Sequence, residues 1–225
     1  MKILTGNQIG INLDGRWLYR DVNFEVQEHQ VLALLGENGV GKTTLLKALM
    51  QEINLTEGNF EWAKKDVEIA YVPQYRSDMQ AFPLNIKEYI GLSFDRGWRP
   101  WLSRTEKDWL QHIIKDTKLD QIAKRRIDQA SGGERQRAFL AQALLKNPDV
   151  LILDEATANL DQSAKFELMD VVKHYRDHHN LSVIMVSHDL EIIQGYADDY
   201  LRLGPDGSEL GPCQSLKMRE GEQNV

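Results

Sequence analysis

The residue types that could carry chemistry are most concentrated between Gly36 and Thr44, which read G-E-N-G-V-G-K-T-T. This stretch follows the apolar run Val31–Leu35, so we expect it to connect a buried strand to a helix that begins near Lys42. Its glycines would let backbone N–H groups approach a phosphate, and the positive end of the helix would attract the same anion. The spacing G-x-x-x-x-G-K-T therefore predicts a phosphate-binding loop. A chance glycine-rich turn is the weaker interpretation, because the whole pattern is present.

Within this loop, Lys42 is long enough to reach the β- and γ-phosphates of a nucleotide, and the Thr43 hydroxyl is a candidate Mg²⁺ ligand. Thr44 can donate one more hydrogen bond to phosphate. The residues predicted to contact the nucleotide are Gly36, Glu37, Asn38, Gly39, Val40, Gly41, Lys42, Thr43 and Thr44.

Two carboxylates follow a second apolar run, Val150–Leu153. A buried strand would deliver Asp154 and Glu155 to its carboxyl end, where sites on open α/β sheets lie. Asp154 is a candidate Mg²⁺ contact, and Glu155 is a candidate general base for an attacking water. An acidic turn after a core strand is the alternative, and the phosphate-binding loop in the same chain makes it less favoured.

A third motif, Ser131-Gly132-Gly133-Glu134, is predicted to begin a helix. Ser131 is a good N-cap, and the glycines expose N–H groups at the helix start, which suits an anion. Since the first loop already holds the phosphates, this second site could contact a nucleotide held by another subunit. A plain capped helix is the alternative, and the residue types alone do not exclude it.

Composition limits the class of protein. A chain of 225 residues fits one large domain, and its net charge of −7 gives no bulk attraction for nucleic acid. The single cysteine, Cys213, excludes an internal disulfide and fits a reducing compartment. We see no signal peptide and no apolar stretch of membrane-spanning length, so another protein would have to hold this chain at a membrane.

Hydrophobic periodicity predicts an α/β fold with a mainly parallel core sheet, an antiparallel β part and an inserted helical sub-domain. Strands are expected at 2–9, 22–26, 31–35, 58–62, 67–72, 150–153, 181–186 and 200–203. Helices are expected at 42–50, 85–91, 105–115, 131–147, 162–179 and 189–195, with one or two turns at 119–124. Asn85 is expected to cap the helix at 85–91, and Thr105 with Asp108 to begin the helix at 105–115. Turns are expected at Asp14-Gly15 and at 205–207. We expect a single domain over 1–225, with its core at about 1–80 and 148–215, the helical sub-domain at about 81–147 and a tail at 216–225.

Taken together, these motifs resemble the ATP-binding subunit of ABC transporters. Gly36–Thr43 resembles Walker A, Val150–Glu155 Walker B, and Ser131–Glu134 the family signature. Further matches are the Q-loop glutamine, the D-loop aspartate and the switch histidine, which are Gln74, Asp161 and His188. The resemblance spans about residues 3 to 210, with the motifs in family order.

The resemblance implies two subunits arranged head to tail around two ATP molecules with Mg²⁺. Each ATP would contact Lys42 and Thr43 of one chain and Ser131, Gly132, Gly133 and Glu134 of the other. Gln74 would join Thr43 and Asp154 at the Mg²⁺ and sense the membrane partner. His188 would hold the γ-phosphate beside Glu155, and Asp161 would lie at the interface.

Three departures from the family pattern stand out. Leu13 occupies the place where an aromatic usually stacks on adenine, and Trp17 is the nearby candidate, with packing on the sheet as an equal alternative. Ala130 and Glu134 replace the usual leucine and glutamine of the signature. His29 stands where a glycine is usual.

The resemblance also implies partners. They are a second ATP-binding subunit, expected to be identical, an integral membrane permease, and a substrate-binding protein as a further candidate, with no nucleic acid. The chain would lie in the cytoplasm, peripheral on the inner face of the cell membrane. Segments at 71–74, 82–84 and 187–190 look similar to zinc and manganese uptake systems. Another substrate, an exporter, or a soluble ABC ATPase of DNA repair or translation remain alternatives.

Two weaker signals have competing interpretations. Trp98, Trp101 and Trp109 could dock onto the membrane subunit, but the small core of the helical insert is the favoured place for them. His174 and His178 are four residues apart, the spacing of a metal-binding pair, with His179 beside them. No acidic or cysteine partner completes the site, so exposed helix-end histidines are the favoured interpretation.

Overall fold

The structure, a computed structural model, describes residues 1–74, 83–94, 101–204 and 207–217. The strands are β1 (Lys2–Leu13), β2 (Arg16–Gln27), β3 (Val31–Leu35), β4 (Glu57–Trp62), β5 (Ile69–Val72), β6 (Val150–Asp154), β7 (Ser182–Val186), β8 (Asp199–Gly204) and β9 (Gly207–Pro212). The α-helices are α1 (Lys42–Leu49), α2 (Ile86–Ile90), α3 (Arg104–Asp116), α4 (Gly132–Leu144), α5 (Gln162–His178) and α6 (Leu190–Tyr196). Short 3₁₀ turns are η1 (Gly91–Ser93), η2 (Asp120–Ile122), η3 (Ile127–Gln129) and η4 (Cys213–Ser215).

Two sheets form the body of the molecule. The six-stranded sheet has the order β5-β6-β7-β3-β8-β9 and is parallel except for β9, while β2-β1-β4 is a separate antiparallel sheet. The predicted combination of a mainly parallel core with an antiparallel part is therefore confirmed. Strand β9 was not predicted, because its residues G-S-E-L-G-P carry no apolar alternation and pair only with the edge of β8.

The hairpin between β1 and β2 turns at Asp14-Gly15, as predicted. Both residues have positive φ, 51° and 82°, as a two-residue turn between twisted strands requires. The two strands are longer than predicted, since they run to the turn itself. The residues that flank the turn, Leu13 and Arg16, are both exposed, so they give no alternating pattern although they pair in the ladder.

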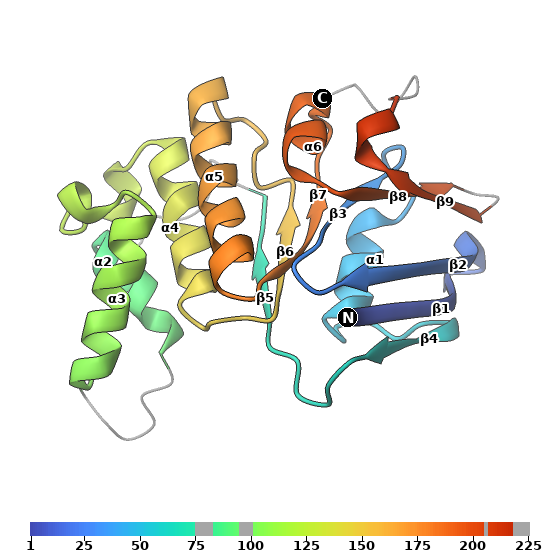
Figure 1. Ribbon diagram of the computed structural model, residues 1–225, viewed down its shortest axis with the longest axis horizontal. Coiled ribbons are helices and arrows are strands. Elements are labelled where there is room, and N and C mark those ends of the chain that lie inside the picture. Colours follow the sequence, from blue (N-terminus) through green and yellow to red (C-terminus); the bar gives the residue numbers. More distant parts are fainter. Residues whose placement is uncertain (75–82, 95–100, 205–206, 218–225) are drawn as a thin grey trace.

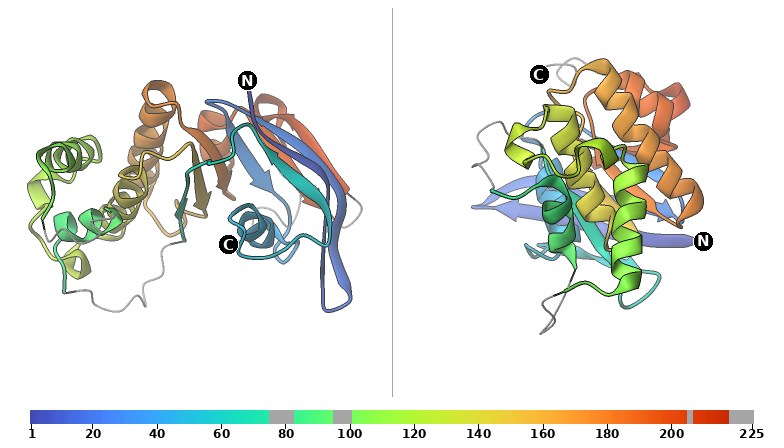
Figure 2. Two further views of the ribbon diagram at one scale, coloured as in Figure 1. Left: turned by 90° about the horizontal axis from the view of Figure 1, so that it is seen from below. Right: turned by 90° about the vertical axis from the view of Figure 1, so that its left-hand side faces the viewer.

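The six-stranded sheet separates two hydrophobic cores. One face packs on α1, β1 and β2, and the other packs on α2 to α6. Figure 2 (left) shows α1 enclosed between the two sheets, with the larger group of helices on the other side. Helices α1 and α4 therefore lie on opposite faces of the same sheet, which decides where their amino ends can act.

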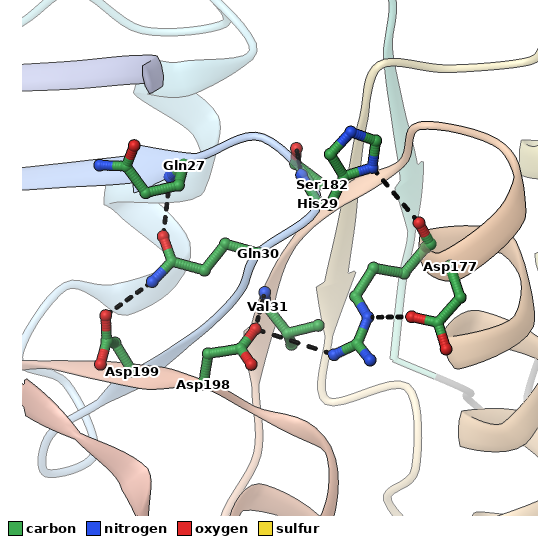
Figure 3. A network of polar contacts seen from close by, with 9 residues as sticks. Gln27, His29, Gln30, Val31, Asp177, Ser182, Asp198 and Asp199 are labelled. Atoms are coloured by element: carbon green, nitrogen blue, oxygen red, sulfur yellow. Dashed lines mark hydrogen bonds and ion pairs between the residues drawn. The ribbon is translucent and has the colours of Figure 1, made fainter. Parts of the chain in front are cut away.

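The amino ends of the parallel strands are fixed by a polar network at the edge opposite the predicted site (Figure 3). The His29 N–H donates to Ser182 Oγ (3.0 Å), the Val31 N–H donates to Asp198 Oδ2 (2.8 Å), and Gln30 Nε2 donates to Asp199 (2.6 Å). His29 has φ of 60°, a left-handed conformation that glycine adopts without strain. This conformation gives a physical reason for the glycine usual at that position.

Helices α2 and α3 extend to one side of the body, beyond α4 and α5 (Figure 1). Asn85 caps α2, as predicted, in a capping box with Glu88. The predicted start of α3 at Thr105 and Asp108 is wrong. Ser103 is the N-cap, and Glu106 completes the capping box because its carboxylate reaches back to the Ser103 N–H (2.6 Å). Trp98 lies outside the described residues.

The described end of the chain packs on the core rather than forming a tail from residue 216. Leu216 is buried, and its carbonyl accepts from Gln194, while the Lys217 carbonyl accepts from Arg202. The rest of the predicted tail, 218–225, and part of the predicted turn at 205–207 lie outside the described residues. Among the described residues, none of the helices has the length and apolar character that crossing a bilayer requires.

Candidate functional site

Four parallel strands bring the predicted catalytic residues to one edge. The register places Val72 beside Leu153, Leu153 beside Met185, and Leu34 beside Val186. The residues that follow these strands are Gly36 after β3, Gln74 after β5, Glu155 after β6 and His188 after β7. The six-stranded sheet thus collects residues that are far apart in the sequence at its carboxyl edge.

The loop from Gly36 to Gly41 has the backbone conformation that its glycines allow. Gly36 and Gly41 have φ of 140° and 104°. A Cβ on Gly36 would lie 2.7 Å from the Leu203 carbonyl oxygen, and one on Gly41 would lie 2.9 Å from the Tyr19 ring. Both positions therefore require glycine. Lys42 is 7% exposed, and its Nζ donates to the carbonyls of Gly36 (2.6 Å) and Glu37 (3.2 Å), so the ammonium sits inside the loop.

Helix α1 differs from the other described α-helices at its amino end. Asn85, Ser103, Ser131, Asp161 and Asp189 each cap the helix that follows them with a side-chain oxygen. Helix α1 begins at Gly41 with no side-chain cap. Its first N–H groups have no acceptor within the helix, so together with the Lys42 ammonium they fit the phosphates of a nucleotide.

Asp154 is 7% exposed and lies next to the phosphate-binding loop. The pKa of its carboxyl is raised, chiefly by burial and also by the charge of Glu155. Hydrogen bonds from Tyr71 and Thr43 and the charge of Lys42 act in the opposite direction. The Tyr71 hydroxyl donates to Asp154 Oδ2 over 3.0 Å. Thr43 and Asp154 are therefore in contact, as two residues that share a Mg²⁺ would be. Tyr71 was not predicted as a site residue, because the sequence indicated only that it lies in the strand expected at 67–72.

We expect the Tyr71→Phe variant to need more Mg²⁺ for ATP hydrolysis. Losing the hydroxyl removes the hydrogen bond that orients Asp154 Oδ2, so the carboxylate is less well placed to bind the ion. The half-saturating Mg²⁺ concentration should rise about fivefold, less than the full value of a hydrogen bond to a charged group, because water reaches this site. Tyr196→Phe, which removes a similar hydroxyl bond to Asp170 (2.8 Å), should change nothing. Equal Mg²⁺ dependence of the Tyr71 variant and the wild type would contradict the positioning role.

Glu155 is held between two of the predicted catalytic residues. Its Oε2 accepts from Gln74 Nε2 (2.7 Å), and its Oε1 lies 3.3 Å from His188 Nε2. Glu155 has φ of 50°, a left-handed conformation that is uncommon outside glycine and is often found at functional sites. A pocket of about 450 Å³ opens here, lined by Gln74, Glu155, Thr157, Ala158, Asn159, Lys165, Ser187, His188, Asp189 and Leu190.

Ser131 caps α4 in a full capping box. Its Oγ accepts from the Glu134 N–H (3.2 Å), and Glu134 Oε2 accepts from the Ser131 N–H (2.7 Å). Because Oγ acts as the acceptor, the Ser131 hydroxyl hydrogen is still available to donate. Burial raises the pKa of Glu134, but the bonds from Ser131 and the charges of Arg125 and Arg137 outweigh it, so the pKa is lowered. The Glu134 carboxylate is thus bonded to Ser131 and Arg125 of its own chain.

The signature helix also contacts the Q-loop and α5. Buried Gln136 donates to the carbonyl of Pro73 (3.2 Å), the residue before Gln74. The sequence did not reveal this bond, because Gln136 and Pro73 are 63 positions apart. A Cβ on Gly133 would lie 2.9 Å from Ala164 Cβ of α5, so glycine permits this close packing. Ser131 and Lys42 belong to helices on opposite faces of the sheet. Among the described residues, Ser131 therefore makes no hydrogen bond to the phosphate-binding loop of its own chain.

Two other predicted residues have clear local contacts. Asp161 caps α5 by accepting from the Ala164 N–H (2.9 Å), a structural role beside the predicted one at an interface. Trp17 is half-buried, its ring lies against Gly10, and the Arg20 guanidinium stacks over it at 4.3 Å from the centroid. This arrangement matches the alternative in which Trp17 packs on the sheet. Leu13 is 48% exposed at the end of β1.

Comparisons with known proteins agree with this geometry. The family model described as ABC transporter matches residues 19–158. The chain is 34% identical over 195 residues to the zinc import ATP-binding protein ZnuC of Acinetobacter baylyi, covering 86% of this chain and 71% of that protein. It is 30% identical over 233 residues to the zinc transport system ATP-binding protein AdcC of Streptococcus pneumoniae, covering 100% and 99%.

A solved structure with a similar fold is cbiO1 of Clostridium perfringens, described as part of the ABC transporter complex cbiONQ. Its TM-score is 0.84 at 24% identity, covering 95% of this chain and 89% of that one. A nucleotide-free ATP-binding cassette from an ABC transporter has a TM-score of 0.82 at 19% identity, covering 94% and 92%. These likenesses confirm the predicted fold class. The chain belongs to the ABC transporter family, as an ATP-binding subunit of the kind that hydrolyses ATP to power transport.

Proposed function

We propose that this chain hydrolyses Mg-ATP on the cytoplasmic face of a membrane and drives a separate permease that imports a divalent metal ion. The observation that supports it most is the convergence of Lys42, Asp154, Glu155 and His188 at one sheet edge. The metal cargo rests on relatives named for zinc import and transport and on one named a probable metal transport system ATP-binding protein, from Thermotoga maritima, at 33% identity.

In this proposal the loop 36–44 and the amino end of α1 bind the triphosphate. The uncapped N–H groups and the Lys42 ammonium supply its hydrogen bonds and countercharge. Thr43, Gln74 and Asp154 would hold Mg²⁺, which neutralises phosphate charge when it is bound. ATP supplies the phosphoryl group whose transfer to water releases the free energy for transport.

Glu155 would take a proton from the attacking water through the oxygen that now faces His188 or Gln74. Both partners lie within about 3.3 Å of its carboxylate, so the three side chains can orient one water among them. His188 and Gln74 would act by placing hydrogen-bond donors where charge develops on the γ-phosphate. The pocket of about 450 Å³ beside them leaves room for this water and the end of the nucleotide.

A second copy of the chain would complete each site. Since Ser131 and Lys42 lie on opposite faces of one sheet, a head-to-tail pair is the arrangement that brings Ser131, Gly132 and Gly133 of one copy to the nucleotide of the other. Asp161 would lie at this interface. A membrane permease and an extracytoplasmic substrate-binding protein complete the proposed assembly.

A groove beside the Q-loop suits the permease. It encloses about 570 Å³ and is lined by Ile69, Ala70, Tyr71, Leu92, Ser93, Phe94, Gln142, Ala143 and Lys146. Leu92 is 56% exposed, and Ser93 next to it is held by a bond to the Gln142 carbonyl (2.8 Å). Exposed apolar side chains on a fixed turn are suited to packing against a short helix of a partner. Residues 75–82, which follow the Q-loop glutamine, lie outside the described residues.

We expect Leu92→Arg to uncouple the chain from its permease. A charge in the apolar groove should lower recovery of the permease from detergent-solubilised membranes at least about tenfold, as loss of a central apolar contact does. ATP binding by the isolated chain should be unchanged, because Leu92 is an exposed residue of η1 and not part of the phosphate-binding loop. Leu210→Arg, a change at another exposed leucine on β9, is the matched control.

The same recovery of partners from detergent-solubilised membranes tests the proposed function. Recovery of a multi-span membrane protein with the wild type and the Leu210 variant, but not with the Leu92 variant, supports a transport ATPase. Recovery of soluble partners alone, such as ribosomes or DNA-repair proteins, would contradict it.

A further inference from the structure

A buried glutamine joins the signature helix α4 to the catalytic carboxylate. Gln136 is 0% exposed, and its Nε2 donates to the carbonyl of Pro73 (3.2 Å). Pro73 comes directly before Gln74, whose own Nε2 donates to Glu155 Oε2 (2.7 Å). Two hydrogen bonds, with the Pro73–Gln74 peptide between them, therefore connect α4 to Glu155.

The side-chain amide of Gln136 is only half satisfied. Its Oε1 is buried and has no hydrogen-bond partner among the described residues. A buried acceptor without a donor costs stability, because it loses its bonds to water and gains none in return. A methionine of similar length would fill the same space without this cost. Packing alone therefore gives no reason for glutamine here, and what the side chain supplies is the bond to Pro73.

The bond reaches the Q-loop at the point where its strand ends. Strand β5 is an edge strand of the six-stranded sheet, and its pairing with β6 runs as far as Val72. Pro73 follows as an exposed residue, and it has no N–H. Its carbonyl is thus the one hydrogen-bonding group that its backbone offers, and Gln136 takes it.

Helix α4 is well fixed on its side of this bond. The residue before Gln136, Arg135, donates to the Ala130 carbonyl (2.8 Å). The residue after it, Arg137, forms an ion pair with Glu167 of α5 (2.8 Å). Since both neighbours of Gln136 are bonded within the body of the protein, the glutamine has little freedom to turn away from the Q-loop.

The same helix begins at the motif that is proposed to contact the second copy's nucleotide. A rise of 1.5 Å per residue places Gln136 about 7 Å along α4 from Ser131. A nucleotide that fixes the amino end of α4 would therefore also fix the glutamine that holds the Q-loop. The bond gives a short physical route between the two ATP sites of the proposed pair.

We propose that Gln136 is a positioning residue, which holds the Q-loop so that Gln74 faces Glu155 and the attacking water. The inference rests on the proposed function, because Gln74 is assigned its role in ATP hydrolysis there. Gln136 itself contacts neither water nor nucleotide in this arrangement. Its loss should therefore slow the chemical step and leave ATP binding, which belongs to the loop 36–44, unchanged.

Hydrolysis by a full-length Gln136→Met variant tests the proposal. A displacement on the order of 1 Å can cost about 10²-fold in rate, so we expect kcat to fall at least about tenfold. The KM for ATP should stay within about twofold of the wild-type value, because uniform binding is untouched. The temperature of unfolding should not fall, since the unpaired Oε1 is gone and the carbonyl of exposed Pro73 can bond to water.

Gln194→Met is the matched control for these measurements. Gln194 of α6 also donates through Nε2 to a backbone carbonyl, that of Leu216, over 3.2 Å. This bond lies at the described end of the chain and has no connection to the Q-loop. The control variant should hydrolyse ATP as the wild type does.

A double-mutant cycle with Gln74→Ala shows whether Gln136 acts through Gln74. If it does, Gln136→Met should change kcat by less than about twofold once Gln74 is absent. An equal loss in both backgrounds would overturn the proposal, and so would a wild-type kcat in the Gln136 variant. A lower kcat together with an unfolding temperature below that of the Gln194 variant would also overturn it, as a role in folding only. Absence of hydrolysis in the wild type would instead contradict the proposed function, and this inference with it.

Discussion

A Glu155→Gln variant of this chain should bind ATP and lose nearly all steady-state hydrolysis. The change keeps the shape of the side chain and its contacts with Gln74 and His188, which now lie 2.7 Å and 3.3 Å from the carboxylate. It removes the carboxylate that lies between Gln74 and His188 and could accept a proton from water, whereas Asp189, which also lines the pocket, is paired with Lys165. Loss of a general base lowers rates by about 10²–10⁴-fold, so phosphate release should fall within or beyond that range.

Two measurements on this variant distinguish loss of the general base from loss of ATP binding. Phosphate release reports hydrolysis, and size-exclusion chromatography with Mg-ATP reports the head-to-tail dimer, which should accumulate because ATP is not consumed. Glu25→Gln, at an exposed glutamate paired with Lys2, is the control and should behave as the wild type. Turnover at the wild-type rate in the Glu155 variant would rule out the general-base role.

A Ser131→Arg variant should lose hydrolysis in the assembled transporter while its own phosphate-binding loop stays intact. Arginine would place a long charged side chain where the second copy's nucleotide is proposed to sit, and it would remove a hydroxyl donor. Removing one preorganised donor costs a factor on the order of 10²–10³ in rate, and the steric block adds to this. Binding of ATP to the isolated chain should be unchanged, because Lys42 is on the opposite face of the sheet.

Ser103 provides a matched control for this change. It caps α3 in the same way as Ser131 caps α4, with a capping box to the third residue of its helix, Glu106. Ser103→Arg and Ser131→Arg should each cost about 1 kcal/mol of stability through the lost cap. A shift in unfolding common to both variants, with hydrolysis lost in the Ser131 variant alone, supports the interface role. Equal hydrolysis in the two would show that Ser131 is merely a helix cap.

The sequence predicted the elements that carry strong local signals. Buried strands such as Val31–Leu35 are uninterrupted apolar runs, and Asn85 and Ser131 are N-caps with a glutamate three residues later. The start of α3 was misplaced, although Ser103 and Glu106 have that same spacing, because Thr105 and Asp108 offered a competing pair. Strand β9 carries no periodic signal, and its pairing with β8 comes from the tertiary fold.

The candidate site was predictable where a motif is continuous and unpredictable where it depends on contacts across the fold. Lys42, Asp154 and Glu155 could be assigned from short motifs that follow buried strands. The bond from Tyr71 to Asp154 and that from Gln136 to Pro73 join residues 83 and 63 positions apart.

The most direct test of the central claim is metal accumulation by cells whose own copy of this chain is replaced by the Glu155→Gln variant. Uptake of radioactive zinc and manganese is compared with that of wild-type cells at equal protein levels. We expect uptake of at least one of these ions to fall to the background of cells lacking the chain. Wild-type uptake of both ions would contradict the claim that ATP hydrolysis at Glu155 powers metal import.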